Sequence, residues 1–495
     1  MSYRISIGRM VVTALALAFV PVRVSAEEFS PAGDREVVTL SMEDCVLSGI
    51  RNSFEIRMAK LDLYIAETGV MYSEAVFDTF LYGGAAYSED KRQQLSVFAS
   101  DNTQGNSYNL GLGKRLPTGT DVSIELGDDR LWNNTAFVDV NPSHSSQLEV
   151  DIRQPVGRNM FGMIDRNNIT LARIAVDMAA LEEQDRVEAA IADIKDAYLE
   201  LVFAKRSLDI YYGMLAKARQ LYESDKKNHE IGLKEKVDLL ASEANLTAFQ
   251  ADVLVAENSY KNAEERLKLK MNFADDARIV PSDELRESVM GMTLEECLKT
   301  AFEKRRDYEE KRKDVDAKGI ELAIERNRAW PEIDLSMSFA MNGVSDKFKK
   351  AFGKTVVIDN TYYVAGVEFR VPLENSQARS LTEKAKQEKM KAITDLKFKE
   401  RSIITEVVNA FNTMITFREG TDFLTRAVVL QADKLMEEEK RFRSGRSDTK
   451  KMIDYQQDLL GAELRAADSI YRERLAEIEL ERSMNVILDK YKELI

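Results

Sequence analysis

Side chains that could catalyse a reaction are scarce in this sequence. Its 495 residues include only two histidines, His144 and His229, and two cysteines, Cys45 and Cys297. The histidines stand apart in polar stretches, so we expect surface positions and no Ser/His/Asp or Cys/His arrangement. The stretch NLGLGK lacks the GK[ST] ending and the following helix of a phosphate-binding loop. We therefore expect no enzyme, no cofactor and no metal centre.

The two cysteines stand in matching contexts, SMEDCVLSGI and TLEECLKTAF. In each, a Ser or Thr precedes a helix as its capping residue. We expect Cys45 and Cys297 to fill small buried positions on these helices. A disulfide between them is the alternative in an oxidising compartment, although equivalent positions in two repeats need not meet in space.

Net charge and composition exclude further classes of function. The formal net charge is −14, and a nucleic-acid binder needs dense basic patches, so we expect no nucleic acid among the partners. The chain is 44% hydrophobic and 31% charged. This is too apolar for a disordered chain and too charged for a bundle of membrane helices.

Charged residues alternate with apolar ones in the stretch LEVDIRQPV. Glu149, Asp151 and Arg153 occupy one face of a predicted strand, whose other face is apolar. Glu368 and Arg370 alternate with apolar residues in the same way near the end of a later strand. A soluble sandwich also alternates, but charged faces opposite aromatic-rich ones favour a β-barrel in lipid with a water-filled lumen. We expect these five charged residues to face that lumen.

Further strands are expected near Phe80 and Tyr82, over 108–112 and 122–126, and over 333–341 and 365–371, with the aromatic residues on the apolar side. Neither half of the chain has enough strands to close a barrel alone. Closure therefore requires strands from several chains. The hairpin over 108–126 either widens the barrel or projects outside it; the sequence leaves both open.

The N-terminus has the pattern of a secretory signal peptide, residues 1–26. Arg4 and Arg9 precede a short apolar run, and cleavage after Ala26 fits the small-x-small rule. No later run of about 18 apolar residues could serve as a membrane helix. We therefore expect an exported chain.

Two copies of one unit follow. Cys45 and Cys297 lie 252 residues apart, Pro155 and Pro372 lie 217 apart, and Gly232 and Gly445 lie 213 apart. The first copy thus has 35 extra residues before its proline. We assign 27–272 to repeat 1, 273–292 to a linker and 293–495 to repeat 2. Barrel strands are expected at about 78–155 and 333–373.

Each copy also contains two long helices joined at a glycine. A heptad pattern predicts a continuous helix over about 165–231, roughly 100 Å long at 1.5 Å per residue. The seam predicted in it comprises Val187, Ile191, Ile194, Tyr198, Leu201, Leu208, Tyr212 and Leu215. After Gly232, a second seam is predicted at Val237, Leu240, Ala244, Thr247, Ala251 and Leu254. Each copy therefore contains a long antiparallel coiled-coil hairpin with a glycine at its tip; a purely structural coiled coil is the alternative.

These pieces, in this order and repeated twice, resemble the TolC-like outer-membrane efflux proteins. The resemblance rests on the openings LSMEDCVLSGIRNSFEI and MTLEECLKTAFEKRRDYEE, on NRAWPEIDL, on RQPV and RVPL, and on the tips IGLKEKVDLLASE and FRSGRSDTKKMIDYQQ. It covers nearly the whole mature chain.

The resemblance implies an α+β fold in a homotrimer. A trimeric outer-membrane β-barrel, surrounded by lipid, would continue into a long α-helical coiled-coil tunnel through the periplasm. The chain would be the passive outer-membrane channel of a tripartite efflux system, with an inner-membrane pump and a periplasmic adaptor as partners. Two alternatives remain: the channel of a type I protein secretion system, and a non-channel periplasmic coiled-coil scaffold.

The resemblance also implies roles for residues at the hairpin tips. Asp238 and Asp454 match carboxylates that point into the tunnel mouth, whereas Lys451 departs from the family pattern. A trimer would present Asp454 as a ring of three, which is a natural cation site.

Arg446 and Asp448 are expected to lock the mouth by ion pairs across helices, although exposed pairs are weak. An adaptor is expected to dock at the tips, which are formed by Gly232, Leu233, Ser444 and Gly445.

Overall fold

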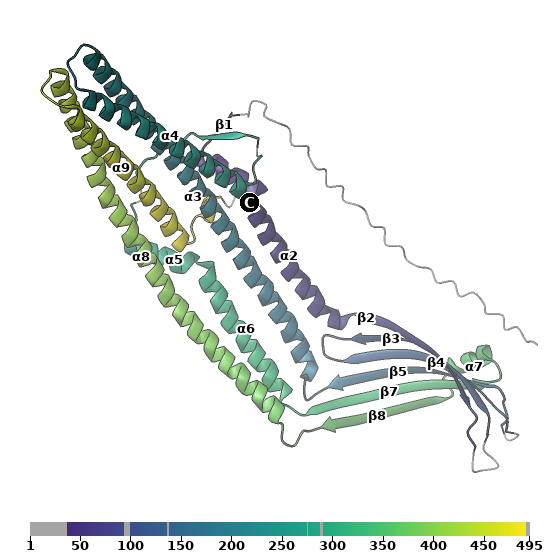
Figure 1. The fold of residues 1–495 in the computed structure, drawn as a ribbon. Coiled ribbons are helices and arrows are strands. Elements are labelled where there is room, and N and C mark those ends of the chain that lie inside the picture. Colours follow the sequence, from purple (N-terminus) through teal and green to yellow (C-terminus); the bar gives the residue numbers. More distant parts are fainter. Residues whose placement is uncertain (1–36, 94–99, 136–137, 275, 288–290, 492–495) are drawn as a thin grey trace, which may run out of the picture.

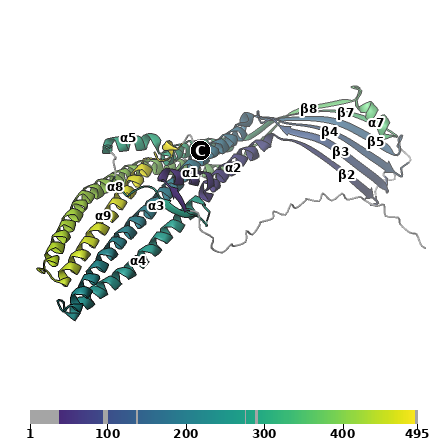
Figure 2. The same ribbon diagram turned by 90° about the horizontal axis from the view of Figure 1, so that it is seen from above.

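The long helices and the six-stranded sheet occupy opposite ends of an elongated molecule (Figures 1 and 2). The structure, a computed structural model, describes residues 37–93, 100–135, 138–274, 276–287 and 291–491. The expected signal peptide, residues 1–26, lies outside this part. Among the described helices, none is both long and apolar enough to cross a membrane.

The two halves of the chain repeat one order of elements. In the first half, β1 (Val37–Leu40), α1 (Met42–Asn52) and α2 (Phe54–Glu74) precede four strands and two long helices. The strands are β2 (Thr79–Asp90), β3 (Thr103–Arg115), β4 (Asp121–Asn133) and β5 (Ser143–Pro155), and the helices are α3 (Met163–Glu230) and α4 (Lys236–Met271).

The second half begins with β6 (Arg278–Pro281), which pairs in parallel with β1 and lies in the segment assigned to a linker. It continues with α5 (Leu294–Lys304), α6 (Arg306–Arg328), β7 (Glu332–Ser345), α7 (Phe348–Thr355) and β8 (Thr361–Arg370). It ends with the long helices α8 (Ser376–Arg443) and α9 (Thr449–Ser483).

Six strands form one antiparallel sheet in the order β2-β3-β4-β5-β7-β8. The sequence did not decide whether the hairpin over 108–126 belongs to the barrel or projects outside it. This hairpin is part of the sheet, because β3 and β4 lie between β2 and β5. Five of the six strands have 12 to 14 residues and β8 has 10. A tilted strand needs about 9–11 residues to cross a bilayer, so all six are long enough.

The long helices match in length between the two halves to within one residue. Helices α3 and α8 have 68 residues each, and α4 and α9 have 36 and 35. Local signals fix where the short helices begin: Ser41 and Thr293 form capping boxes with Asp44 and Glu296 at the starts of α1 and α5. The predicted long hairpins are confirmed.

One predicted seam is confirmed at its first five positions, whereas Tyr212 further along it is exposed, and the other seam is wrong. The first five seam residues named for α3, from Val187 to Leu201, are buried in one core cluster with α1 and α4. On α4, however, Val237, Leu240 and Leu254 are exposed. The buried stripe of α4 is instead Ser242, Asn245, Phe249, Val253, Ala256, Tyr260, Ala263 and Leu267. Two stripes on α4 fit a heptad pattern. Packing against α3 buries the stripe that contains the aromatic residues Phe249 and Tyr260.

Both cysteines are fully buried and unpaired within the described chain, as the favoured interpretation predicted. Cys45 lies in the core around α1 and α3, whereas Cys297 lies in a separate cluster with α8. Burial raises the pKa of the Cys45 thiol to about 12. The thiol is therefore uncharged and unreactive at neutral pH.

Candidate functional site

One face of the six-stranded sheet is polar. The register pairs Glu149 with Ala340, Asp151 with Ser338 and Arg153 with Ser336, so these charged residues share a face. Pairing of β7 with β8 brings the two other residues predicted to face the lumen onto the same face, because Glu368 lies opposite Asp334 and Arg370 opposite Glu332. The structure thus collects all five predicted residues on one side of the sheet.

Ion pairs and hydrogen bonds run across this polar face. Arg153 Nη2 lies 2.5 Å from Asp334 Oδ2, and Arg115 Nε lies 2.7 Å from Asp121 Oδ1. The Ser338 hydroxyl donates to Asp151. Such residues need water or one another as partners, so this face cannot lie against lipid.

The opposite face is apolar and largely exposed in the single chain. Its exposed members come from all six strands: Leu81, Leu110, Leu112, Ile124, Ile152, Leu335, Met337, Val367 and Phe369. Contiguous exposed apolar surface of this kind marks a membrane or protein contact. The two faces together match the alternation of a barrel strand between lipid and water.

Phe80 and Tyr82 correct the sequence-based assignment, since they lie on the polar face. The register places Phe80 opposite Gly113 and Tyr82 opposite Gly111. A Cβ on Gly111 would meet the Tyr82 ring at 2.4 Å, so the ring covers a site that only glycine leaves open. Alternation alone cannot assign a face; the cross-strand neighbour does so here.

The two hairpin tips have the same geometry. Gly232 and Gly445 have φ of +78° and +70°. Past each glycine, a backbone N–H reaches back five residues: Leu233 donates to the Asn228 carbonyl at 2.7 Å, and Arg446 to the Arg441 carbonyl at 2.9 Å. This is the Schellman turn that ends a helix at a left-handed glycine. Leu233 and Ser444, the neighbours of the two glycines, are exposed.

The acidic residues predicted for the tunnel mouth differ in their surroundings. Asp238 Oδ2 lies 3.7 Å from Lys234 Nζ, whereas Asp454 is exposed on α9. Asp448 caps α9 by accepting the Lys451 N–H at 2.8 Å. Among the described residues, Arg446 forms no salt bridge, so no Arg446–Asp448 ion pair exists within this chain. A lock between chains remains a prediction.

A buried contact between the two tips escaped sequence analysis. The Thr449 hydroxyl donates to Asp225 Oδ2 at 3.0 Å, and Lys234 Nζ donates to the same hydroxyl at 3.0 Å. Asp225 and Thr449 are fully buried, and burial raises the pKa of Asp225 above its ordinary value. The sequence shows only a carboxylate, Asp225, within a predicted helix. It does not indicate the partner Thr449, which lies 224 residues away.

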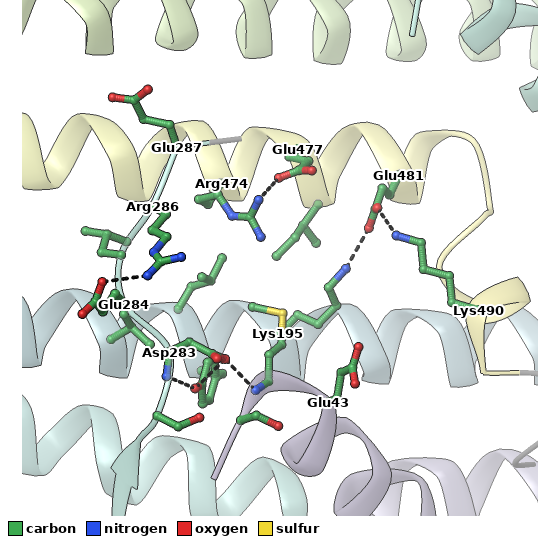
Figure 3. Close-up of a pocket in the computed structure, with 18 of the residues that line it drawn as sticks. Glu43, Lys195, Asp283, Glu284, Arg286, Glu287, Arg474, Glu477, Glu481 and Lys490 are labelled. Atoms are coloured by element: carbon green, nitrogen blue, oxygen red, sulfur yellow. Dashed lines mark hydrogen bonds and ion pairs between the residues drawn. The ribbon is translucent and has the colours of Figure 1, made fainter. Parts of the chain in front are cut away.

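A charged pocket of about 720 Å³ lies at mid-length, between α3, α9 and the segment after β6 (Figure 3). Its cations are paired: Lys195 and Lys490 both contact Glu481, at 2.7 and 2.5 Å, and Arg474 contacts Glu477 at 2.6 Å. Ligand pockets are mostly apolar with few polar groups. Here the Lys195–Glu481 ion pair instead joins the two halves of the chain.

The sheet also brings a serine, a histidine and an aspartate together, but not as a catalytic triad. Ser146 donates to Asp128 Oδ1 at 2.6 Å, and His144 Nδ1 lies 2.8 Å from Asp128 Oδ2. The aspartate thus stands between the other two, whereas a triad needs the histidine beside the nucleophile. His229 binds the Lys234 carbonyl at 2.9 Å. Within the described residues, no group of His, Cys, Asp or Glu could hold a metal ion.

Comparison with solved structures identifies the fold. The CmeC outer membrane channel of Campylobacter jejuni superposes with a TM-score of 0.69 at 13% identity, covering 92% of this chain and 89% of that chain. The open state of the MtrE outer membrane channel of Neisseria gonorrhoeae gives 0.65 at 15%, covering 92% and 93%. A membrane protein of Pseudomonas aeruginosa gives 0.69 at 16%, covering 95% and 99%.

No curated protein matches the chain significantly. The family model described as "Outer membrane efflux protein" matches residues 122–272 and 297–486, which is more than half of the chain. Its two segments correspond to the two repeats, and each ends in a helical hairpin. The chain therefore belongs to the outer membrane efflux protein family, and it is a transport protein of the outer membrane rather than an enzyme.

Proposed function

We propose that three copies of this chain form one channel, which conducts substrates from an inner-membrane pump and a periplasmic adaptor to the exterior. The observation that carries the proposal is the six-stranded sheet, with one apolar face, one charged face and two open edges, β2 and β8. Open edges need partners, and in a membrane only a closed sheet satisfies every backbone group. Three copies would place eighteen strands, six from each, in one barrel. Barrels of about 16–18 strands leave an aqueous channel.

The repeat supports a ring of hairpins. Since α3 and α8 begin and end 213 residues apart, we call residues 213 positions apart in the two hairpins counterparts. Ile210 on α3 is 5% exposed, but its counterpart Phe423 on α8 is 75% exposed. Ala467 on α9 is 4% exposed, and its counterpart Leu254 on α4 is 66% exposed.

These differences have one explanation. Among the described elements of one chain, α3 packs against α9, whereas no comparable packing joins α4 to α8. If α8 of one copy packs against α4 of the next, the same contact recurs around a closed ring. The exposed stripe on α4, which the heptad pattern singled out, then becomes an interface between chains.

The helices give the channel its reach. Helices of 68 residues are about 100 Å long, which suits a tunnel through the periplasm. The tips at Gly232 and Gly445 would form the mouth and the docking site of the adaptor. Asp454, repeated three times, would form an acidic ring at that mouth.

Planar-bilayer conductance of the detergent-extracted protein tests this proposal. We expect discrete, low conductance from the wild type, and higher conductance or lower cation sensitivity from Asp454→Asn. Asp238→Asn is the matched variant at the other tip, where Lys234 already pairs with the carboxylate. Equal conductance in wild type and Asp454→Asn would remove Asp454 from the mouth. No conductance from a well-folded preparation would overturn the channel and favour a periplasmic scaffold.

A further inference from the structure

Helix α7 (Phe348–Thr355) lies on the apolar face of the sheet, at the end far from the long helices (Figures 1 and 2). It is held tightly to the strands. Ala351 and Thr355 are fully buried, and the Thr355 hydroxyl donates to the Ser146 carbonyl at 3.0 Å. A Cβ on Gly343 would meet the Ala351 carbonyl oxygen at 2.2 Å. The helix is thus a fixed part of the sheet surface rather than a loose loop.

Helix α7 lies at the height where the band of apolar residues on this face of the sheet ends. Towards the far end of this face, Leu126 is followed by Asp128 on β4, and Leu148 by Ser146 on β5. On β7, Met341 is followed by Gly343, which contacts α7.

Helix α7 also lies beside the polar cluster of Asp128, His144 and Ser146. The His144 ring packs edge-on against Phe348, with centroids 6.4 Å apart. If the band lies in hydrocarbon, α7 therefore lies at the level of the lipid headgroups.

The outer surface of α7 combines aromatic and basic side chains. Phe348 and Phe352 stack with ring centroids 5.9 Å apart and remain 47% and 37% exposed. Aromatic residues at this height and lysines beside them are typical of segments that lie in the membrane interface.

Four of the eight residues from 347 to 354 are lysines, in a chain of net charge −14. Lys350 pairs with Asp346 at 3.2 Å, and Lys354 donates to the Val344 carbonyl at 2.9 Å. Lys347 and Lys349 are exposed and form no salt bridge within the described part of the chain. Their charge is therefore available to a negatively charged partner.

We propose that α7 is an interfacial lipid-binding helix, with Phe348 and Phe352 among the lipids and Lys347 and Lys349 on anionic headgroups of the outer leaflet. The inference rests on the proposed membrane position of the sheet, which places the end far from the long helices outside the cell. Headgroup phosphates are the partner that fits, because they lie at this depth and carry the opposite charge.

Spin labels at three positions test the proposal in vesicles that contain the full-length protein. Phe352→Cys reports on α7, Met337→Cys on the middle of the apolar band, and Val344→Cys on the polar face at the height of α7. Cys45 and Cys297 are fully buried and will not compete for the label. Water-soluble and lipid-soluble relaxing agents then measure whether each label lies in water or lipid. The vesicles contain phosphatidylcholine alone, or with about a third phosphatidylglycerol.

We expect the label at 337 in lipid, at 344 in water and at 352 at headgroup depth, with severalfold less access to water in anionic than in neutral vesicles. Lys347→Gln with Lys349→Gln should abolish the difference between vesicles. Lys350→Gln is the matched control, since that lysine already pairs with Asp346. A label at 352 as wet as that at 344, or equally shielded in both vesicle types, would overturn the inference. A wet label at 337 would instead overturn the membrane position of the sheet.

Discussion

The two helical hairpins have the same lengths and the same turns, yet their counterparts differ in burial and charge. Asp225 and its counterpart Glu438 are both buried carboxylates near a tip. Asp225 is bound by Thr449 of the other hairpin, whereas Glu438 is bound by Ser447 and Arg441 of its own. Equal backbones thus support two kinds of tip contact, one between the two hairpins and one within a single hairpin.

The sheet shows the opposite relation. Repeat 1 contributes four strands and repeat 2 contributes two. Hairpins that pack side by side must match in length, because an unmatched end would expose apolar surface. A closed sheet accepts additional strands, because each new strand satisfies its neighbours in the same way. Duplicated units are therefore constrained in the helices and free to diverge in the sheet.

The largest expected effect is a cross-link between chains. Phe203 on α3 stacks on Tyr471 on α9, with centroids 4.8 Å apart. Their counterparts Thr416 on α8 and Asn258 on α4 are both exposed. If the repeated contact closes the ring, Thr416→Cys with Asn258→Cys should form a disulfide between chains upon oxidation. Denaturing gels would then show covalent dimers and trimers. Each single variant is the control. A double variant that stays monomeric on the gel would contradict the proposed ring of hairpins.

Asp196 tests the difference in charge between the two hairpins, because its counterpart on α8 is the uncharged Asn409. Burial, with Asp193 and Glu479 nearby, raises the pKa of Asp196 to about 6, against the favourable charges of Arg482 and Lys195. Its Oδ1 is buried without a hydrogen-bond partner among the described residues.

The raised pKa makes stability depend on pH. Between pH of about 4 and 6, the folded chain holds a proton that the unfolded chain has lost, so stability falls as pH rises through this window. We expect Asp196→Asn to raise the free energy of unfolding above pH 6 by about 2–3 kcal/mol and to flatten the pH dependence. Hydrogen exchange in the middle of α3 measures both. An unchanged pH profile would contradict the prediction.

The contact between the tips gives a smaller effect. Thr449→Val removes the hydroxyl that donates to Asp225, leaving a buried carboxylate with fewer partners at a cost of about 1–3 kcal/mol. Faster hydrogen exchange near 225 and 449 would report the loss. Ser447→Ala is the matched change at the tip between α8 and α9, where it removes a donor to Glu438. It should speed exchange at the second tip only; equal effects at both tips would mean that the tips do not differ.

The smallest effect is expected at the tip glycines. Gly232 and Gly445 have positive φ and nothing within 4 Å of an added Cβ, so alanine would meet only conformational strain. Each change should cost about 1 kcal/mol, by equal amounts at the two tips. Gly213 lies within α3 and also has nothing within 4 Å of an added Cβ; there alanine should stabilise the helix by up to about 1 kcal/mol. Thermal unfolding of the three variants tests the contrast.

Local patterns determined much of this molecule. The charges of Glu149, Asp151 and Arg153 fall on one face because side chains alternate along a strand whatever its neighbours are. Gly232 and Gly445 end their helices because glycine adopts the left-handed backbone conformation at little cost in free energy, unlike residues with a Cβ. The capping residues Ser41 and Thr293 act within one helical turn, so sequence alone locates them.

Tertiary structure decided the features that depend on distant neighbours. Phe80 and Tyr82 lie on the polar face because glycines on β3 accept their rings, and only the strand register shows this. The buried stripe of α4 was chosen by packing against α3, since the heptad pattern fits two stripes. Asp225 and Thr449 meet across 224 residues, and no local signal encodes such a pair. A periodic sequence specifies which side chains share a face, whereas burial depends on which surface that face meets.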